Sequence, residues 1–115
     1  MTTIDVTREA DYATITISNP ERKNAISAAA CQEMAAELSS LATDNSIRCV
    51  VVTGAGEDFC SGLDLTEGIA GASVSQELET GLNAIATALL RMEKPTVARV
   101  RGACVGAGAS IATAC

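Results

Sequence analysis

The chain has no histidine and no tryptophan, and Tyr12 and Phe59 are its only aromatic residues. Without histidine, these 115 residues cannot form a Ser-His-Asp triad, a Cys-His pair or a His-ligated metal site. With so few aromatic rings, they offer no stacking surface for single-stranded nucleic acid. Basic residues are scarce too, because 8 Lys and Arg stand against 14 Asp and Glu, and the net charge is -6. We therefore expect no nucleic-acid partner.

The five cysteines include no C-x-x-C pair, so their spacing indicates neither a zinc site nor a redox dithiol. No bound metal is expected. Four of them lie among Ala and Val residues, where Cys commonly behaves as a small buried apolar residue: Cys31, Cys49, Cys104 and Cys115. Cys60 lies in a polar loop, and it is the one cysteine whose reactivity we would test.

Long apolar runs are absent as well. No stretch approaches the roughly 18 apolar residues of a membrane span, and residues 1–11 lack the apolar core of a signal peptide. Together with the cysteine pattern, this favours a reducing, cytoplasmic compartment. The chain is nevertheless 48% hydrophobic. A chain of this length buries roughly 65% of its unfolded surface, so we expect a single domain over residues 1–115.

Apolar periodicity predicts four strands. Residues 3–8 and 13–18 alternate between apolar and polar side chains, which is typical of two strands joined by a hairpin at 9–12. The continuous apolar run 49–53 indicates a strand that is covered on both faces, as in a parallel sheet. A further strand is predicted over 96–100.

Helical spacing predicts three helices between and after these strands. Ser27 is a plausible N-cap for a helix that ends at about Thr43. A second helix is predicted over 74–92, and Pro95 prevents it from continuing. The composition of 109–115 favours a third. The order ββαβαβα predicts an α/β layered fold with parallel strands.

Two glycine-rich loops follow the predicted parallel strands, where open α/β sheets bind their ligands. The loop after 49–53 begins G-x-G, but Phe59 stands where a dinucleotide fingerprint needs its third glycine. The glycines at 102, 106 and 108 also have the wrong spacing, and neither loop has the Gly-Lys-Ser/Thr of a P-loop. A small nucleotide-binding domain is therefore a weak alternative. Backbone N–H groups at the start of the last helix do suit a developing negative charge.

Several segments taken together carry a family resemblance. They are Ile15–Ile26 (ITISNPERKNAI), Cys49–Gly54 (CVVVTG), Phe59–Leu65 (FCSGLDL) and Lys94–Ser110 (KPTVARVRGACVGAGAS). In this order, they resemble the N-terminal half of the crotonase superfamily, the enoyl-CoA hydratase/isomerase family. The resemblance implies a spiral of ββα turns truncated to its N-terminal part. It also implies an acyl-CoA thioester substrate, with coenzyme A as part of the substrate and no separate cofactor.

The resemblance assigns roles to residues of both loops. It implies that the backbone N–H groups of Leu63 and Ala107 form an oxyanion hole for a thioester enolate, the catalytic element that the family shares. It places basic residues near the coenzyme A phosphates at Arg22 and Lys23. The remaining substrate-binding positions that it implies are Ser61, Gly62, Leu65, Gly106, Gly108 and Ser110.

One position departs from the family pattern. Family hydratases carry a catalytic Glu where this chain has Ser110, and water addition uses a pair of carboxylates. The departure favours an isomerase, such as a Δ3,Δ2-enoyl-CoA isomerase, or another one-acid reaction over hydration. Asp64 and Glu67 are the nearest acids, and Asp64 is expected to shape its loop rather than move protons.

The alternative is a non-catalytic fragment that binds acyl-CoA or a partner subunit. The last predicted helix would expose an apolar face, so we expect either a fragment or a second chain that completes the fold. The resemblance also implies a possible homo-oligomer. Residues 66–79, which are polar and contain glycine, are where we expect acyl-chain specificity to reside.

Overall fold

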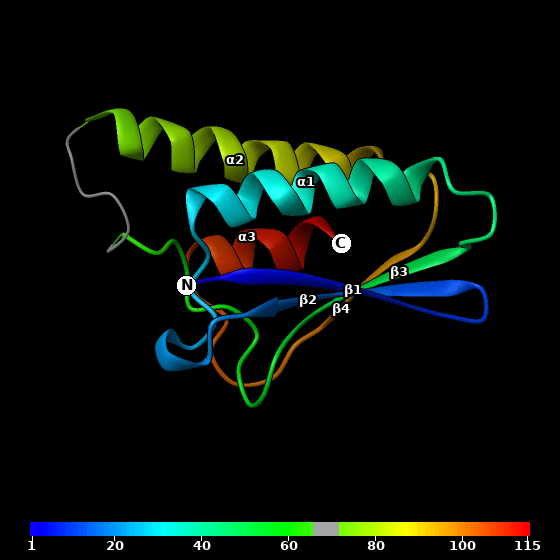
Figure 1. Ribbon diagram of the computed structural model, residues 1–115, viewed down its shortest axis with the longest axis horizontal. Coiled ribbons are helices and arrows are strands. Elements are labelled where there is room, and N and C mark those ends of the chain that lie inside the picture. Colours follow the sequence, from blue (N-terminus) through cyan, green and yellow to red (C-terminus); the bar gives the residue numbers. More distant parts are fainter. Residues whose placement is uncertain (66–71) are drawn as a thin grey trace.

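A four-stranded sheet carries helices on one face in the computed structural model of the chain, which describes residues 1–65 and 72–115 (Figure 1). The strands follow the sequence order across the sheet: β1 (Thr3–Glu9), β2 (Tyr12–Ser18), β3 (Cys49–Gly54) and β4 (Thr96–Arg99). β1 pairs antiparallel with β2, whereas the β2–β3 and β3–β4 pairs are parallel. The predicted α/β class and hairpin are thus confirmed.

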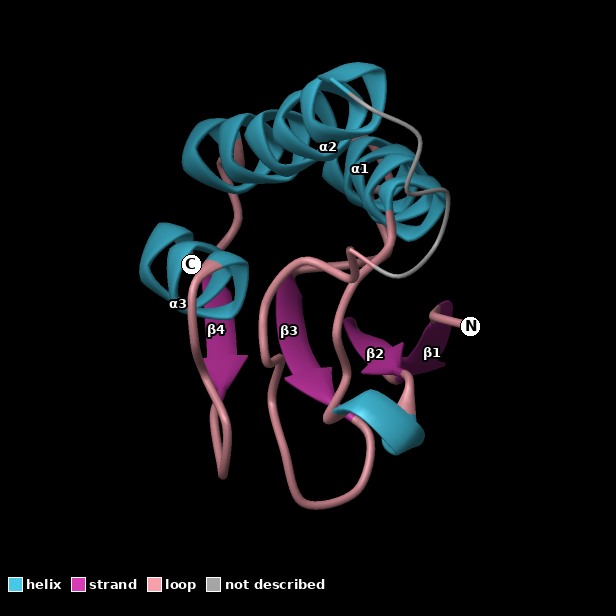
Figure 2. Cartoon of the chain, turned by 90° about the vertical axis from the view of Figure 1, so that its left-hand side faces the viewer, coloured by secondary structure: helices cyan, strands magenta, loops and turns pink. Residues whose placement is uncertain are grey.

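Three helices cover the sheet. α1 (Ala28–Ala42) and α2 (Ala72–Arg91) lie side by side above it, and α3 (Ala107–Ala114) packs between α2 and β4 (Figure 2). A short 3-10 turn, η1 (Pro20–Arg22), links β2 to α1. No helix in the described part of the chain is long and apolar enough to cross a membrane.

The alternating pattern of β2 explains which face is covered. Ala13, Ile15 and Ile17 are fully buried, while the intervening Thr14 and Thr16 are only partly covered. Burying the apolar face of the strand against the helices supplies the main favourable free energy of such a layer.

The prediction that β3 is covered on both faces is wrong for the described residues. Val50 and Val52 are fully buried, but Cys49 and Val51 are only partly buried. The reason is that the described helices pack on one face of the sheet, so an apolar run does not by itself require two covered faces (Figure 2).

The buried apolar residues of α1 recur at the predicted helical spacing. The Ser27 Oγ accepts a hydrogen bond from the Ala30 N–H at 3.2 Å, so the predicted N-cap is confirmed. The apolar residues of its buried face are Cys31, Met34, Leu38 and Leu41. At the far end, the Lys94 ammonium donates to the carbonyl oxygens of Leu41 and Asp44 at 2.6 Å each. These bonds satisfy one carbonyl group in the last turn of the helix and one just beyond it, where a cation is favourable.

Two helix starts differ from the predicted ones. α2 begins at Ala72 instead of 74, and α3 begins at Ala107 instead of 109. In α3, Gly106 takes the N-cap position with φ at 56°, which Gly adopts more readily than other residues. Ala107 therefore becomes the first helical residue, a position that bears directly on the site described next.

Candidate active site

Two loops beyond the carboxyl ends of β3 and β4 pair with each other. Cys60 and Cys104 form an isolated parallel bridge. The Ala103 carbonyl accepts hydrogen bonds from the N–H groups of Phe59 and Cys60 at 3.0 Å, and the Val105 N–H donates to the Cys60 carbonyl at 3.1 Å. The loops 59–63 and 103–107 thus run alongside each other in a fixed register.

Glycines permit the close approach of the two loops. Gly62 and Gly106 lie two residues after the bridged cysteines, and both have positive φ, at 121° and 56°. A Cβ added to Gly106 would lie 4.0 Å from the Gly62 Cα. A Cβ added to Gly108 would overlap the Cys60 carbonyl oxygen, so the start of α3 rests directly on the first loop. These positions therefore require residues without a side chain.

Leu63 and Ala107 are among several backbone donors of these loops that donate no hydrogen bond within the described residues. The neighbours of Leu63 are engaged, because Gly62 O accepts from the Ile26 N–H at 2.9 Å and the Asp64 N–H donates to Ile26 O at 2.8 Å. Within residues 1–65 and 72–115, neither the Leu63 N–H nor the Ala107 N–H donates a hydrogen bond. Ala107 is the first residue of α3, whose N–H has no partner inside the helix.

The polar residues predicted for substrate binding lie around a shallow groove of about 430 Å³. Its lining residues are Glu21, Arg22, Lys23, Ala25, Ser61, Leu63, Asp64 and Leu65. The Ser61 Oγ donates to the Arg22 carbonyl at 2.7 Å, and the Ser61 N–H donates to the Lys23 carbonyl at 3.0 Å. The structure therefore brings the predicted residues of the two segments together.

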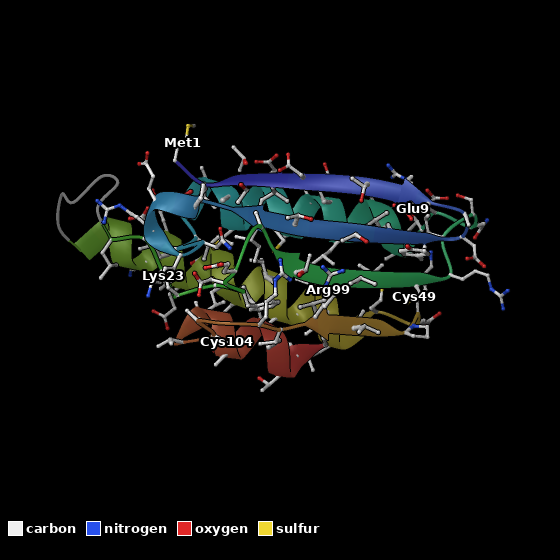
Figure 3. All side chains as sticks on the ribbon, turned by 90° about the horizontal axis from the view of Figure 1, so that it is seen from below. Met1, Glu9, Lys23, Cys49, Arg99 and Cys104 are labelled. Carbon is white, nitrogen blue, oxygen red and sulfur yellow. The ribbon has the colours of Figure 1, made fainter. Side chains whose placement is uncertain are left out.

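The other predicted positions lie beside the groove rather than in it. Gly106, Ala107, Gly108 and Ser110 belong to the α3 start and do not line the groove. Gly62 does not line the groove either, although its neighbours Ser61 and Leu63 do. Figure 3 shows Lys23 and Cys104 toward the same end of the sheet, with Cys49 toward the other end.

Asn24 holds the basic loop in place, and the sequence analysis missed it. Lys23 and Asn24 both have positive φ, at 51° and 62°, in the left-handed region that costs most non-glycine residues energy. The buried Asn24 amide compensates, because its Oδ1 accepts from the Asn19 N–H at 2.9 Å and its Nδ2 donates to the carbonyls of Ala55 and Asp58. The sequence feature that could have identified Asn24 is the ability of Asn to adopt the left-handed conformation in turns.

A second set of contacts fixes the paired loops to the end of β3. The Arg101 guanidinium donates to the carbonyls of Gly54 and Gly56 at 2.8 and 2.7 Å. The Asp58 Oδ1 accepts from the Ala103 N–H at 2.7 Å. Such charge-assisted bonds are stronger than neutral ones, so the carboxyl end of β3 is a rigid support for both loops.

The acids near the site differ in their surroundings. Asp64 is buried and accepts a hydrogen bond from the Asn19 Nδ2 at 3.3 Å, an inward contact that agrees with a role in shaping the loop. Glu67 lies outside the described residues, as does much of the segment 66–79 that was expected to set specificity. At the start of α3, the exposed Ser110 hydroxyl donates to the Gly106 carbonyl at 3.3 Å.

Cys60 is the cysteine whose reactivity we would test, and the structure places it in the interior. Its side chain is fully buried among the core residues, and burial raises the pKa of its thiol. Because the thiolate is the nucleophile, a buried thiol with a raised pKa is a poor one on its own. No group of three or more potential ligand residues within the described ranges could hold a metal ion.

The chain thus has a layered α/β fold in which two paired glycine loops follow β3 and β4, and solved structures of the crotonase fold class match it. Residues 7–115 match the family model described as enoyl-CoA hydratase/isomerase, and the chain belongs to this family. The family resemblance noted in the sequence is thereby confirmed.

Relatives in this family carry both hydratase and isomerase names. The chain is 35% identical over 99 residues to an enoyl-CoA hydratase of Alternaria alternata, a match that covers 84% of this chain and 33% of the relative. It is 31% identical over 109 residues to the 1,2-epoxyphenylacetyl-CoA isomerase of Escherichia coli, covering 90% of this chain and 42% of that enzyme.

The fold agrees with solved structures of the same family. A crystal structure of an enoyl-CoA hydratase/carnithine racemase from Magnetospirillum magneticum superimposes with a TM-score of 0.90 at 28% identity. The match covers 100% of this chain and 45% of that one. The chain thus spans less than half the length of these relatives.

Substituting Gly108→Ala should destabilise the chain by about 1–3 kcal/mol, because the new methyl group overlaps the Cys60 carbonyl and pushes α3 off the first loop. Urea unfolding followed by circular dichroism measures the change. Thr113→Ala, an exposed substitution on the same helix, is the control and should alter stability by no more than about 0.5 kcal/mol. A Gly108→Ala chain as stable as the original would contradict the close contact.

Proposed function

We propose that this chain is part of an enzyme that binds an acyl-CoA thioester and stabilises its enolate through the N–H groups of Leu63 and Ala107. The observation that carries the proposal is that the N–H groups of Leu63 and Ala107 have no partner among the described residues and lie in two loops whose register is fixed by the Cys60–Cys104 bridge. Each of the two residues follows the bridged cysteine of its loop by three positions.

The proposed role of the two N–H groups depends on where negative charge develops during the reaction. Removing a proton next to a thioester carbonyl places negative charge on the carbonyl oxygen. Backbone donors that already point at that oxygen need no reorganisation, which is why such an arrangement lowers the barrier. The positive end of the α3 dipole acts in the same direction, because Ala107 begins this helix.

Arg22 and Lys23 are the proposed contacts for the phosphates of coenzyme A. Coenzyme A is a polyanion and the chain carries a net charge of -6, so binding needs a local group of cations. Both residues line the groove, and their backbone carbonyls are tied to Ser61. We assign the adenine-contacting role to the backbone around Ser61 and Leu65, which line the same groove.

Within the family, we propose isomerase or other one-acid chemistry rather than hydration. Ser110 is a hydroxyl where a hydratase needs a carboxylate, and a hydroxyl is a far weaker base at neutral pH. Moving a proton between two carbons needs one acid/base group. We further propose a homo-oligomer, or a second chain that completes the fold, in a cytoplasmic setting.

The oxyanion hole can be tested without turnover. Acetoacetyl-CoA forms an enolate that absorbs in the near ultraviolet, and two well-placed donors should raise the enolate fraction on binding. Leu63→Pro and Ala107→Pro each remove one donor. Proline is well tolerated at the first position of a helix, so Ala107→Pro should leave α3 intact. We expect either variant to lose the enolate band, and to lower any turnover by about 10²–10³.

The matched controls are Leu63→Met and Ala107→Ser, which keep the backbone N–H and should keep the enolate band. Circular dichroism verifies that each variant is folded. If the band persists in a folded Ala107→Pro chain, the oxyanion assignment is wrong. If the original chain binds acetoacetyl-CoA without any enolate band, the non-catalytic alternative replaces the enzymatic one.

The type of reaction should appear in a comparison of two substrates. We expect the purified chain, with its mass and oligomeric state recorded, to convert a 3-enoyl-CoA to its 2-enoyl isomer without hydrating a 2-enoyl-CoA. The physical reason is the missing carboxylate at Ser110. Chromatographic separation of the two possible products gives the result, and hydration of the 2-enoyl substrate would refute the one-acid proposal.

The phosphate contacts should appear in coenzyme A affinity. Arg22→Gln combined with Lys23→Gln is expected to weaken binding about three- to tenfold, since exposed charge pairs contribute modestly. Arg48→Gln is the control and should change little, because Arg48 is an exposed cation that directly precedes Cys49, which lies toward the opposite end of the sheet from Lys23 (Figure 3). Calorimetric titration at two salt concentrations provides the test, because screening should reduce the difference. Equal losses in both variants would indicate only a general charge effect.

A further inference from the structure

Two cysteines face each other across the paired loops. Cys60 and Cys104 are direct partners in the parallel bridge. Residues paired on neighbouring strands have Cα atoms about 4.8 Å apart, which lies within the roughly 4.4–6.8 Å that disulfides span. Partners in a parallel ladder also project their side chains to the same face. The backbone thus places both thiols on one side of the loops.

The two thiols differ in accessibility. Cys60 is fully buried, and its Sγ lies 3.8 Å from the Gly62 carbonyl oxygen. Cys104 is partly exposed and packs against the edge of the core. Burial raises the pKa of the Cys60 thiol, and the nearby Cys104 adds a smaller effect in the same direction, which agrees with the short separation. A reagent from solution therefore meets Cys104 first.

We propose that Cys60 and Cys104 are a modification site that forms a disulfide by exchange with a low-molecular-weight disulfide such as glutathione disulfide. The cross-link would join the loops 59–63 and 103–107 at their point of pairing. This inference rests on the bridge between the loops and does not depend on the proposed function. All five cysteines are free in the structure, so the proposed disulfide describes an oxidised state of the chain.

The exchange balances in two steps. The Cys104 thiolate attacks one sulfur of glutathione disulfide, forms a mixed disulfide and releases one glutathione thiolate. The Cys60 thiolate then attacks the Cys104 sulfur, forms the Cys60–Cys104 bond and releases the second glutathione thiolate. The protons of the two cysteines end on the two glutathiones. Two cysteine thiols are thus oxidised, and one glutathione disulfide is reduced to two thiols.

A second pairing competes with this one. Cys31 on α1 is also fully buried, and the pKa of its thiol is raised to about 12, mainly by burial and to a lesser extent by Cys60. Cys31 belongs to a helix and has no backbone pairing with Cys60, whereas Cys104 is held opposite Cys60 by the ladder. The ladder favours Cys104 as the partner, and the experiment must separate the two.

The test is to equilibrate the native chain with glutathione disulfide and to follow intact mass and free thiols. We expect a species that has lost two hydrogen atoms and two of its five thiols, and that a reductant restores. Cys31→Ala and Cys115→Ala are the matched controls and should give the same loss. Cys60→Ala should instead retain a glutathionyl group on Cys104, and Cys104→Ala should form no internal disulfide.

Two results would overturn the proposal. One is a native chain that acquires only glutathionyl groups and never loses two hydrogen atoms. The other is an internal disulfide that survives in Cys104→Ala but disappears in Cys31→Ala, which would identify Cys31 as the partner. Repeating the exchange in urea distinguishes specific pairing from chance, because unfolding should abolish the preference for Cys104. Circular dichroism confirms that each variant is folded before oxidation.

Discussion

The pairing between the loops 59–63 and 103–107 is the contact on which the rest of the site depends. It has few hydrogen bonds, two of which converge on the Ala103 carbonyl. Through it, two segments that follow different strands share one register, in which Leu63 and Ala107 each lie three positions after a bridged cysteine. Since Gly108 lets the start of α3 rest on Cys60, the pairing also orients this helix relative to the first loop. The glycines of these loops are therefore required for packing, whether or not they also contribute to the chemistry.

Buried polar contacts make this arrangement rigid. Asn24 and Arg101 donate to backbone carbonyls of the turn that leaves β3, and Asp58 of this turn accepts from the Ala103 N–H. Each of these partly buried bonds satisfies a polar group that would be costly to leave unpaired. Lys23 and Asn24 have an unfavourable backbone conformation with positive φ. In this conformation, the Lys23 carbonyl accepts a hydrogen bond from the Ser61 N–H. The shape of the groove therefore depends on these hydrogen bonds between the loops.

The strands and helices were predictable because their apolar residues follow two simple periods. Ile15 and Ile17 alternate along β2, while Met34 and Leu38 recur at helical spacing along α1. The prediction failed for β3, since an apolar run is compatible with one covered face as well as two. The groove residues Arg22, Lys23 and Ser61 came from family resemblance and not from periodicity. Asn24 escaped notice because its importance lies in contacts with Ala55 and Asp58, far away in sequence.

The sequence alone determined the α/β class, the hairpin, the N-cap at Ser27 and the family, since each is written in local spacing or in the order of short segments. It also determined that a hydroxyl stands at Ser110. Only the tertiary structure decided that Cys60 is buried and opposite Cys104, and that the N–H groups of Leu63 and Ala107 have no partner among the described residues. The reason is that burial and loop pairing depend on contacts between segments that are far apart in the sequence. Local sequence patterns do not specify these contacts.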